Sequence, residues 1–253
     1  MNTPTPTQAC PVTIITGASR GLGLAMALQL AGEGHRVLSI ARQHSDQLPP
    51  SVTQWTDRNL GDPGVTVLEL LAWVLALDQQ HVSAINLINN AGVVATPGPL
   101  AQGDFAELTN AIRVGLEAPL LLTAAFLRAT ATWTVPRKVL LVSSGLGRRG
   151  MAGSSSYCAA KAGLDNLARA LALEEAACAN GARVVSLAPG VIDTDMQIQL
   201  RDADPLRFPE RKLFAGMFEA GQLDSPAKAA AKVLAYLARA DYGHEAVASV
   251  NAS

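Results

Sequence analysis

The sequence predicts an α/β protein in which helices cover both faces of one doubly wound parallel sheet of about seven strands. Three observations support this fold class. Short runs rich in Val and Ile alternate with longer helical patterns, as βαβ units require. The runs are apolar without interruption, which is typical of parallel strands buried on both faces. The first run leads through a glycine-rich turn directly into the first helical pattern.

Each element is predicted from its own pattern along the chain. The predicted strands, with two weaker ones last, cover residues 12–15, 36–41, 84–88, 138–142, 183–187, 51–56 and 246–250. The predicted helices cover residues 21–33, 63–78, 104–131, 155–179 and 225–239.

The domain organisation follows from what separates these elements. Residues 195–222 hold prolines and glycines among charges, and we interpret them as a mobile substrate-side flap with short helices. The chain shows no internal repeat and no linker-like shift in composition. We therefore expect residues 1–253 to form one domain, with residues 1–10 as a flexible tail.

The composition provides ample core material and no excess of charge. Hydrophobic residues make up 49% and charged residues 16%, which favours a folded core. The net charge of -1 lacks the basic excess of nucleic-acid-binding or membrane-surface proteins. The most apolar stretch, residues 65–77, is too short to span a bilayer, and the first eleven residues lack a signal-peptide pattern. We expect a cytoplasmic protein without nucleic-acid or membrane partners.

The cysteines and histidines predict neither a disulfide framework nor a metal site. The three cysteines are widely spaced and form no Cys-x-x-Cys, and the four histidines are scattered without metal-ligand spacing. We therefore expect no bound metal.

The glycine-rich turn after the first predicted strand has the spacing Gly-x-x-x-Gly-x-Gly. Gly17 permits a tight turn, Gly21 lets the backbone approach a pyrophosphate closely, and Gly23 allows the helix to pack on the strand. The N–H groups of the helix N-terminus then face the anion. An ordinary βα turn is the alternative, but the strand before and the helix after favour a dinucleotide site.

Two arginines indicate which dinucleotide the turn prefers. Arg20 lies within the turn, and Arg42 follows the second predicted strand, where a ribose 2′ substituent should lie. An acidic side chain there would bind the 2′-hydroxyl of NAD, whereas an arginine pairs with the 2′-phosphate of NADP. No Asp or Glu occupies residues 39–43. NADP(H) is therefore favoured over NAD(H), with two solvated surface arginines as the alternative.

Tyr157 and Lys161 lie four residues apart in a segment with strong helical patterning, so they share one helix face. A tyrosine alone is a poor acid or base at neutral pH, because its pKa is about 10. A neighbouring ammonium stabilises the phenolate and should lower that pKa. The pair can then donate a proton to a carbonyl oxygen or accept one from an alcohol. A helix-surface contact is the alternative.

Ser144 lies two residues after the strand predicted at residues 138–142 and precedes a glycine-rich loop. Doubly wound folds place ligands at the carboxyl ends of their strands. A hydroxyl there can hydrogen-bond the substrate oxygen and hold it against Tyr157, although a simple turn is the alternative.

Together these residues resemble the short-chain dehydrogenase/reductase family over nearly the whole chain. Five motifs carry the resemblance, in the family's order and at its separations. They are the turn at residues 16–23, Asn-Leu at 59–60, Asn-Asn-Ala-Gly at 89–92, Ser144 with Tyr157 and Lys161, and Pro-Gly-Val-Ile-Asp-Thr at 189–194. Within the family, residues 118–123 and 189–197 are most similar to the branch of sepiapterin and benzil reductases, which reduces ketones and vicinal dicarbonyls with NADPH.

The resemblance implies a Rossmann-type NAD(P)-binding domain and a role for each matched residue. Tyr157 would be the general acid/base, and Lys161 would bind the ribose hydroxyls and lower the Tyr157 pKa. Ser144 would orient the substrate, and substrate contacts are expected from Ser144, Tyr157 and Met196. The implied cofactor-binding residues are Gly17, Ser19, Arg20, Gly21, Leu22, Gly23, Arg42, Asn59, Leu60, Asn90, Ala91, Gly92, Tyr157, Lys161, Pro189, Gly190, Val191, Ile192 and Thr194.

One position departs from the family pattern. The family usually has an Asn on the long helix after Asn-Asn-Ala-Gly, where it supports a water chain that relays protons to the lysine. Gly115 stands there, and no Asn occupies residues 111–119. Either a water fills the space and carries the relay, or the relay is broken and turnover is slow.

The resemblance thus implies an NADPH-dependent carbonyl reductase that acts reversibly on a small ketone, diketone or alcohol. An NAD-linked alcohol dehydrogenase is one alternative, which the two arginines disfavour. A catalytically weak NADP-binding regulator is another, supported by Gly115 and opposed by the intact catalytic residues. The family commonly forms dimers or tetramers through its two long helices, so we expect a homodimer or homotetramer.

Overall fold

The computed structural model describes residues 9–251 and contains one sheet of seven strands in the order β3-β2-β1-β4-β5-β6-β7. Every neighbouring pair in this sheet is parallel, which confirms the predicted fold class. A topological switch point lies between β1 and β4. The strands are β1 (Cys10–Thr16), β2 (Arg36–Ile40), β3 (Thr53–Trp55), β4 (Val82–Asn89), β5 (Arg137–Val142), β6 (Arg183–Ala188) and β7 (Val247–Ser249).

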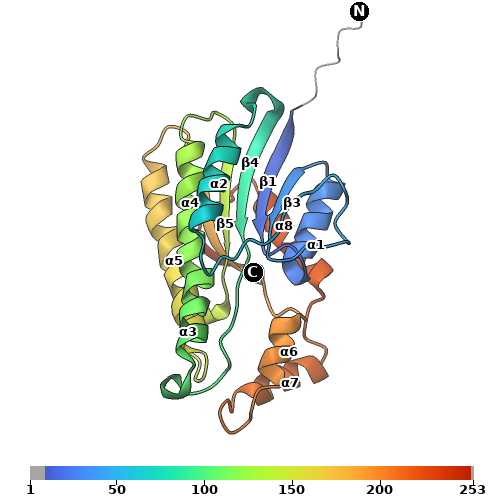
Figure 1. Ribbon diagram of the computed structural model, residues 1–253, viewed down its shortest axis with the longest axis vertical. Helices are drawn as coiled ribbons and strands as arrows, with labels where there is room; N and C mark the ends of the chain where they lie inside the picture. The colour runs from blue at the N-terminus through green and yellow to red at the C-terminus, as the bar shows by residue number, and fades with distance from the viewer. Residues whose placement is uncertain (1–8, 252–253) are drawn as a thin grey trace, which may run out of the picture.

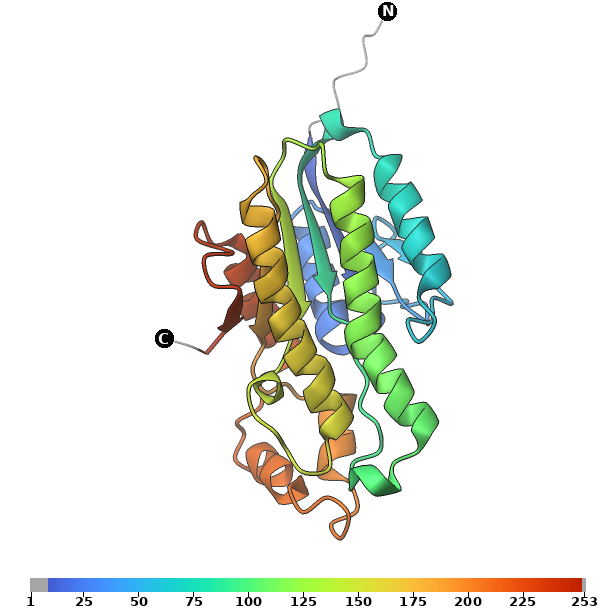
Figure 2. The same cartoon turned by 90° about the vertical axis from the view of Figure 1, so that its left-hand side faces the viewer.

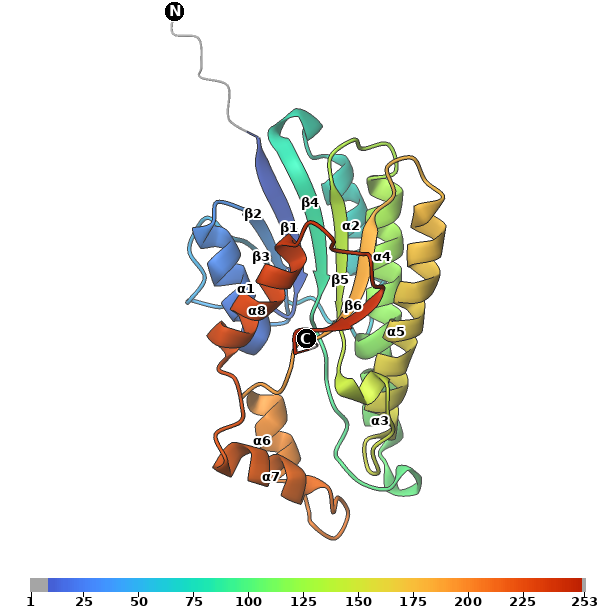
Figure 3. The ribbon, with the colours of Figure 1, turned by 180° about the vertical axis from the view of Figure 1, so that it is seen from behind.

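Helices cover both faces of the sheet (Figures 1 and 3). Helices α2, α4 and α5 pack on one face, and α1 and α8 pack on the other. The α-helices are α1 (Gly21–Gly32), α2 (Gly64–Leu75), α3 (Phe105–Ile112), α4 (Ala118–Ala129), α5 (Ser155–Ala176), α6 (Asp195–Arg201), α7 (Arg211–Glu219) and α8 (Pro226–Ala238). Shorter turns are η1 (Gln79–His81), η2 (Leu100–Gln102), η4 (Gly145–Gly147) and η3 (Arg113–Glu117), of which η3 is π-helical.

Two apolar layers hold the helices to the sheet. One layer contains Leu70 of α2 and Phe126 of α4, and the other contains Met26 of α1. Successive residues of a strand point to opposite layers, so Ile14 joins the first layer and Ile15 the second. This burial on both faces is the physical reason why the strands are apolar without alternation.

The predicted strands and helices are found with their ends shifted by up to three residues, with one exception. The single helix predicted over residues 104–131 is two α-helices, α3 and α4, joined by the π-helical turn η3. Periodicity does not reveal this insertion, because the apolar face continues across it. The predicted tail at residues 1–10 is also too long, since Cys10 pairs with Val82 and begins β1. Residues 1–8 lie outside the described part of the chain.

Helices α6 and α7 lie beyond the carboxyl ends of the strands, at the lower end of Figure 1. The short helices predicted for the flap at residues 195–222 are therefore confirmed, whereas its mobility stays a prediction. The flap has its own small core, in which the ring centroids of Phe208 and Phe214 lie 5.9 Å apart and Met151 packs beside them. A β-bridge between Ile192 and Asp224 joins the two ends of the flap.

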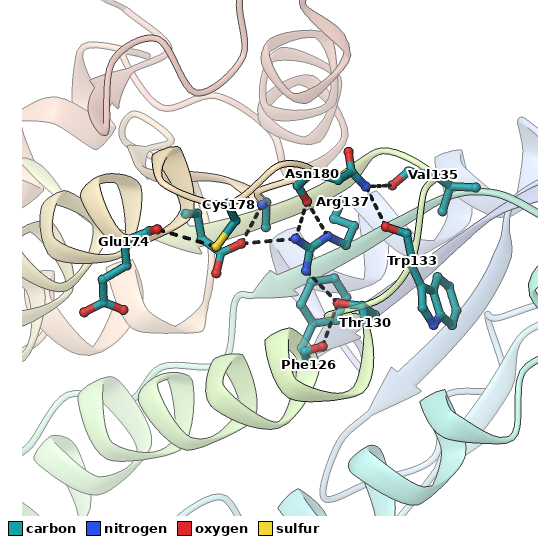
Figure 4. Close-up of polar contacts among 10 residues, drawn as sticks. Phe126, Thr130, Trp133, Val135, Arg137, Glu174, Cys178 and Asn180 are labelled. Carbon is teal, nitrogen blue, oxygen red and sulfur yellow. Dashed lines mark hydrogen bonds and ion pairs between the residues drawn. The ribbon is translucent and has the colours of Figure 1, made fainter.

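The guanidinium of Arg137 joins three elements at the opposite end of the sheet (Figure 4). Its side chain is 3% exposed and lies 3.2 Å from the carboxylate of Glu175. It also donates hydrogen bonds to the hydroxyl of Thr130 at 3.2 Å and to the carbonyl of Asn180 at 3.0 Å. Because Thr130 caps α4, Glu175 lies in the last turn of α5 and Arg137 begins β5, this cluster fixes how the two long helices lie on the sheet.

Residues 105–129, which span α3, η3 and α4, are long and apolar enough to cross a membrane by length and composition alone. Half of their apolar window is buried inside the protein, and Phe126 is completely buried. Core helices of globular proteins pass the same test, and Figure 2 shows α4 lying along the sheet beside α5. The apolar character of this segment therefore matches its place against the core of the protein.

Candidate active site

A cavity of about 810 Å³ lies at the carboxyl ends of the strands, beside the switch point between β1 and β4. Its walls come from the segments that follow β1, β2, β4, β5 and β6, and from the flap. Open doubly wound sheets bind their ligands at this place. Every site residue predicted from the sequence lines the cavity, with the exception of Asn59.

The glycine-rich turn lies against the loop after β4 and leaves no room for side chains. Gly17 and Gly21 have φ angles of 70° and 57°, which residues with a Cβ rarely adopt. A Cβ on Gly17 would lie 2.9 Å from the Cα of Ala91, and one on Gly23 would lie 2.2 Å from the carbonyl oxygen of Gly17. The turn itself therefore requires glycine at these positions, and the result is a wall of bare backbone at the N-terminus of α1.

Asn90 holds this turn from the side of β4. Its Nδ2 donates to the carbonyl oxygens of Thr16 at 3.0 Å and Gly17 at 3.3 Å. The Oγ1 of Thr16 accepts hydrogen bonds from the backbone N–H groups of Asn90 and Ala91, both at 3.0 Å. Asn90 thus positions the turn, and the cofactor contact that the resemblance implies for it stays a prediction.

Three arginines line the cavity beside the turn and the segments after β2 and β3. Arg20 pairs with Asp195 of α6 at 2.7 Å, which connects the turn to the flap. Arg42 is exposed, as expected for a residue that meets a ligand phosphate. Arg58 was missed by sequence reasoning and pairs with Glu69 at 2.7 Å. Its signal was a basic residue shortly after a predicted strand, at the edge where ligands bind.

Asn59 is the one predicted site residue that the structure does not bring to the cavity wall. Its side chain is exposed, and its Oδ1 accepts a hydrogen bond from the backbone N–H of Gly61 at 3.0 Å. A short amide favours such a local bond within a turn. The next residue, Leu60, is buried and lines the cavity.

Ser144, Tyr157 and Lys161 come together on the cavity wall. Tyr157 and Lys161 lie one turn apart on α5, and the Lys161 Nζ is 5.5 Å from the centroid of the Tyr157 ring. The same Nζ donates to the carbonyl oxygen of Val142 at 2.7 Å, at the end of β5. Ser144 follows this strand and accepts a hydrogen bond on its Oγ from the backbone N–H of Leu146 at 3.2 Å.

The pKa values of Tyr157 and Lys161 move in opposite directions because the protein surrounds both groups. Desolvation raises the pKa of Tyr157 to about 12, while a hydrogen bond from Ser144 to the phenolate form acts the other way. Desolvation lowers the pKa of Lys161 to about 8, while the negative charge of Asp165 acts to raise it. The expected lowering of the Tyr157 pKa by Lys161 is not found, because desolvation is the largest effect and the group that opposes it is Ser144. The phenol is therefore protonated at neutral pH.

Asp165 is a buried carboxylate one turn beyond Lys161 on α5, and sequence reasoning missed it. Its Oδ1 accepts hydrogen bonds from the hydroxyls of Ser143 and Ser186, each at 2.7 Å. The Nε of Arg148 lies 3.7 Å from its other oxygen. Asp165 thus ties α5 to the ends of β5 and β6. The available signal was an acidic residue at helical spacing from Lys161, on a face that the sheet buries.

Gly115 lies where the π-helical turn η3 contacts α5. A Cβ at this position would lie 2.9 Å from the Cβ of Ala160, the residue before Lys161. A Cβ on Gly115 would therefore crowd Ala160, and the two alternatives for the proton relay stay predictions. Glycine allows the two helices to approach this closely.

The flap supplies most of the apolar wall at the substrate end of the cavity. Met196, which was predicted, lies on α6, and the segment from Pro189 to Thr194 connects β6 to it. Gln197 of the same helix was missed, because a glutamine in a charged segment carries no sequence signal. The apolar side chains on this wall are Leu146, Met151, Met196, Leu200, Leu213, Phe214 and Met217.

A nicotinamide dinucleotide fits these residues. The bare backbone turn and the N–H groups of α1 suit a pyrophosphate, and the arginines supply positive charge beside it. One continuous cavity contains both Arg42 and Tyr157, and its volume lies within the range of about 300–1,000 Å³ that is usual for cofactor sites. Among residues 9–251, no group of His, Cys, Asp and Glu side chains is placed to hold a metal ion.

Comparisons with known proteins agree with this geometry. The family model for short chain dehydrogenases matches residues 11–205. Benzil reductase ((S)-benzoin forming) of Bacillus cereus is 34% identical over 219 residues, which cover 84% of this chain and 88% of that protein. Sepiapterin reductase of Rattus norvegicus is 34% identical over 250 residues, which cover 91% and 92%.

A solved structure from Agrobacterium tumefaciens with bound NADP is similar over 97% of this chain and 96% of that chain, with a TM-score of 0.75 and 27% identity. The family match spans the glycine-rich turn, the three residues on the cavity wall and the segment that enters the flap. The chain therefore belongs to the short-chain dehydrogenase family and is an oxidoreductase that acts on CH–OH and C=O groups.

Proposed function

We propose that this protein is an NADPH-dependent carbonyl reductase that transfers hydride to a ketone or diketone and can run in reverse on the alcohol. The observation that carries the proposal is the single cavity shared by the glycine-rich turn, Arg42 and the side chains of Ser144, Tyr157 and Lys161. A dinucleotide site and an acid/base site that share one cavity suit hydride transfer coupled to proton transfer.

In this proposal the protein supplies binding, orientation and the proton. A bound nicotinamide would supply the hydride. Ser144 holds the substrate oxygen by a hydrogen bond, and the phenol of Tyr157 donates its proton to that oxygen as the hydride arrives. A phenol with a pKa of about 12 is protonated at neutral pH and so is ready to donate. Lys161 provides a positive charge beside the phenolate that remains.

The preference for NADP(H) over NAD(H) rests on the arginines. Arg42 and Arg58 line the cavity after β2 and β3, where the adenosine ribose is expected. The similar protein from Agrobacterium tumefaciens carries bound NADP. An arginine at this place pairs with a 2′-phosphate, which NAD lacks.

The proposed substrate class follows from the relatives and the cavity wall. One relative is named for reducing benzil, and the substrate end of the cavity here is mostly apolar. An aryl ketone or diketone buries apolar surface against such a wall. We also propose a cytoplasmic homodimer or homotetramer.

The test is a panel of ketones, diketones and alcohols assayed with both NADPH and NADH. We expect NADPH oxidation with diketones or aryl ketones, and at least a hundredfold loss of kcat in Tyr157→Phe with NADPH binding retained. Unchanged turnover in Tyr157→Phe would remove the proposed mechanism. NADPH binding without turnover across the whole panel would favour the NADP-binding regulator instead.

The cofactor preference has its own test. Arg42→Asp is expected to lower kcat/KM for NADPH by about tenfold to a hundredfold, because it removes a charge-assisted bond to the 2′-phosphate. NADH should be affected far less or used better. If Arg42→Asp leaves the NADPH/NADH ratio unchanged, Arg42 does not select the cofactor, and Arg58→Ala then tests the other arginine.

A further inference from the structure

The hydroxyl of Ser144 takes its place from the turn η4 that follows it. Its Oγ accepts a hydrogen bond from the backbone N–H of Leu146, which lies within this turn. No residue of η4 is buried, although Leu146 packs in part against the small core of the flap. A segment without buried side chains gains little from the hydrophobic effect, so other contacts have to hold it.

Arg148 directly follows η4 and anchors it on two sides. Its backbone N–H donates to the carbonyl oxygen of Gly145 at 3.2 Å, which closes the turn. Its side chain then reaches away from the turn, where Nη2 donates to the carbonyl oxygen of Ala248 in β7. The Nε lies 3.7 Å from the Oδ2 of Asp165 in α5. The guanidinium thus connects η4 to α5 and to β7.

The carboxylate of Asp165 gives Arg148 a fixed partner. The Asp165 side chain is 2% exposed, and its Oδ2 makes no hydrogen bond to any described residue. A buried carboxylate oxygen is costly unless positive charge compensates it, and the guanidinium of Arg148 supplies that charge. The backbone of the turn is equally close, because a Cβ on Gly147 would lie 2.9 Å from the same Oδ2. The contact therefore sets how η4 lies on α5, the helix that carries Tyr157.

We propose that Arg148 is a positioning residue that holds η4, and with it the hydroxyl of Ser144, in place beside Tyr157. This inference rests on the proposed carbonyl reductase function, in which Ser144 holds the substrate oxygen. Arg148 then acts on the reaction through Ser144, and its charge serves Asp165 rather than an anionic ligand. An arginine suits this role, because its planar guanidinium donates in several directions at once.

The first experiment tests whether Arg148 acts through Ser144. Arg148→Met should lower kcat about tenfold for the best ketone of the panel and leave the Kd of NADPH nearly unchanged. The adjacent Arg149 is also exposed and lines the same cavity, and Arg149→Met should change neither value. In a Ser144→Ala background, Arg148→Met should lower kcat by less than about twofold, because the hydroxyl that it positions is gone. An equal loss in both backgrounds would overturn the proposal.

A second variant keeps the test decisive if Arg148→Met does not fold. Arg148→Lys retains a positive charge for Asp165, but its compact ammonium cannot span Asp165 and Ala248 together. It should therefore lose part of kcat in the wild-type background and almost nothing in the Ser144→Ala background. An equal loss in both backgrounds overturns the proposal for this variant as well.

Hydrogen exchange distinguishes failure of this inference from failure of the proposed function, because it needs no turnover. Without ligand, the backbone amides of residues 144–149 should exchange about tenfold faster in Arg148→Met than in the wild type, and no faster in Arg149→Met. If the wild type reduces no ketone but this acceleration is seen, the proposed reductase function fails and the hold of Arg148 on η4 stands. Unchanged exchange in Arg148→Met overturns the role of Arg148, whatever the activity.

Discussion

At the scale of single residues, the protonation of Tyr157 decides which direction of the reaction the site favours at a given pH. Its pKa of about 12 keeps the phenol protonated at neutral pH, which suits reduction. Oxidation of an alcohol needs the phenolate, whose fraction rises about tenfold per pH unit below the pKa. We therefore expect kcat/KM for oxidation to rise steadily with pH, as measured from pH 6 to 10. A plateau near pH 7 would show that Lys161 lowers the Tyr157 pKa after all.

Asp165 helps to keep Lys161 charged, because its carboxylate raises the Lys161 pKa. Asp165 is therefore a positioning residue that acts on the reaction through Lys161. Burial lowers the pKa of Lys161 to about 8, and Asp165 opposes this shift. In Asp165→Asn the Lys161 pKa should fall further, so Lys161 loses its charge at a lower pH. The alkaline limb of the pH profile for reduction should then move to lower pH, with a severalfold loss of kcat at pH 7.5. The exposed Asp202→Asn serves as the control, and an unmoved limb in Asp165→Asn would contradict this role.

At the scale of elements, η3 and α5 pack so closely at Gly115 that no side chain fits between them without moving one of the two helices. Gly115→Ala places a methyl group 2.9 Å from the Cβ of Ala160. Overpacking costs about 1–3 kcal/mol, and over most of this range the cost exceeds the roughly 1 kcal/mol gained when alanine replaces glycine in a helix. We expect a lower free energy of unfolding in urea and a lower kcat, because α5 carries Lys161.

The double variant is the control for this contact. Gly115→Ala with Ala160→Gly moves the methyl group from one helix to the other, so it should recover most of the lost stability and turnover. A Gly115→Ala protein that is more stable than the wild type would show that the helices have room to separate.

Substitutions in the cluster around Arg137 should lower the free energy of unfolding and leave kcat unchanged, because the cluster lies at the opposite end of the sheet from the cavity. Arg137→Met leaves the carboxylate of Glu175 without its partner in a site where the arginine side chain is 3% exposed. Removing one partner of a buried pair costs about 3–5 kcal/mol, measured by urea unfolding. Arg137→Met with Glu175→Met should cost less, and the exposed Arg128→Met should change stability little. A loss below about 1 kcal/mol in Arg137→Met would contradict this account.

At the scale of the whole molecule, α4 and α5 form an outer face of the protein, as Figure 2 shows. Leu120 and Leu173 on these helices are exposed. Because the family commonly associates through these helices, we expect light scattering to give the mass of a dimer or tetramer. Leu120→Glu with Leu173→Glu should dissociate it. Leu68 on α2 is also exposed, and Leu68→Glu should leave the oligomer intact. Dissociation by Leu68→Glu alone would place the interface on α2.

Most of the fold could be predicted because its signals are local. A strand that is apolar without interruption is buried on both faces, as Ile14 and Ile15 of β1 show by pointing into opposite layers. The alternation of such strands with helices then predicts a parallel, doubly wound sheet. The π-helical turn at Arg113–Glu117 could not be predicted, because the buried residues Ala111, Gly115 and Ala118 keep ordinary helical spacing across it.

The sequence by itself determined the fold class and the family, and it predicted which residues meet in the cavity, since spacing along a helix or after a strand places Gly17, Tyr157 and Lys161 with little help from the rest of the chain. Only the tertiary structure decided that desolvation raises the Tyr157 pKa, that Ala160 lies against Gly115, and that the buried amide of Gln197 has no hydrogen-bond partner among residues 9–251. The physical reason is that burial and unpaired polar groups depend on contacts between segments far apart in the sequence, which no local pattern records.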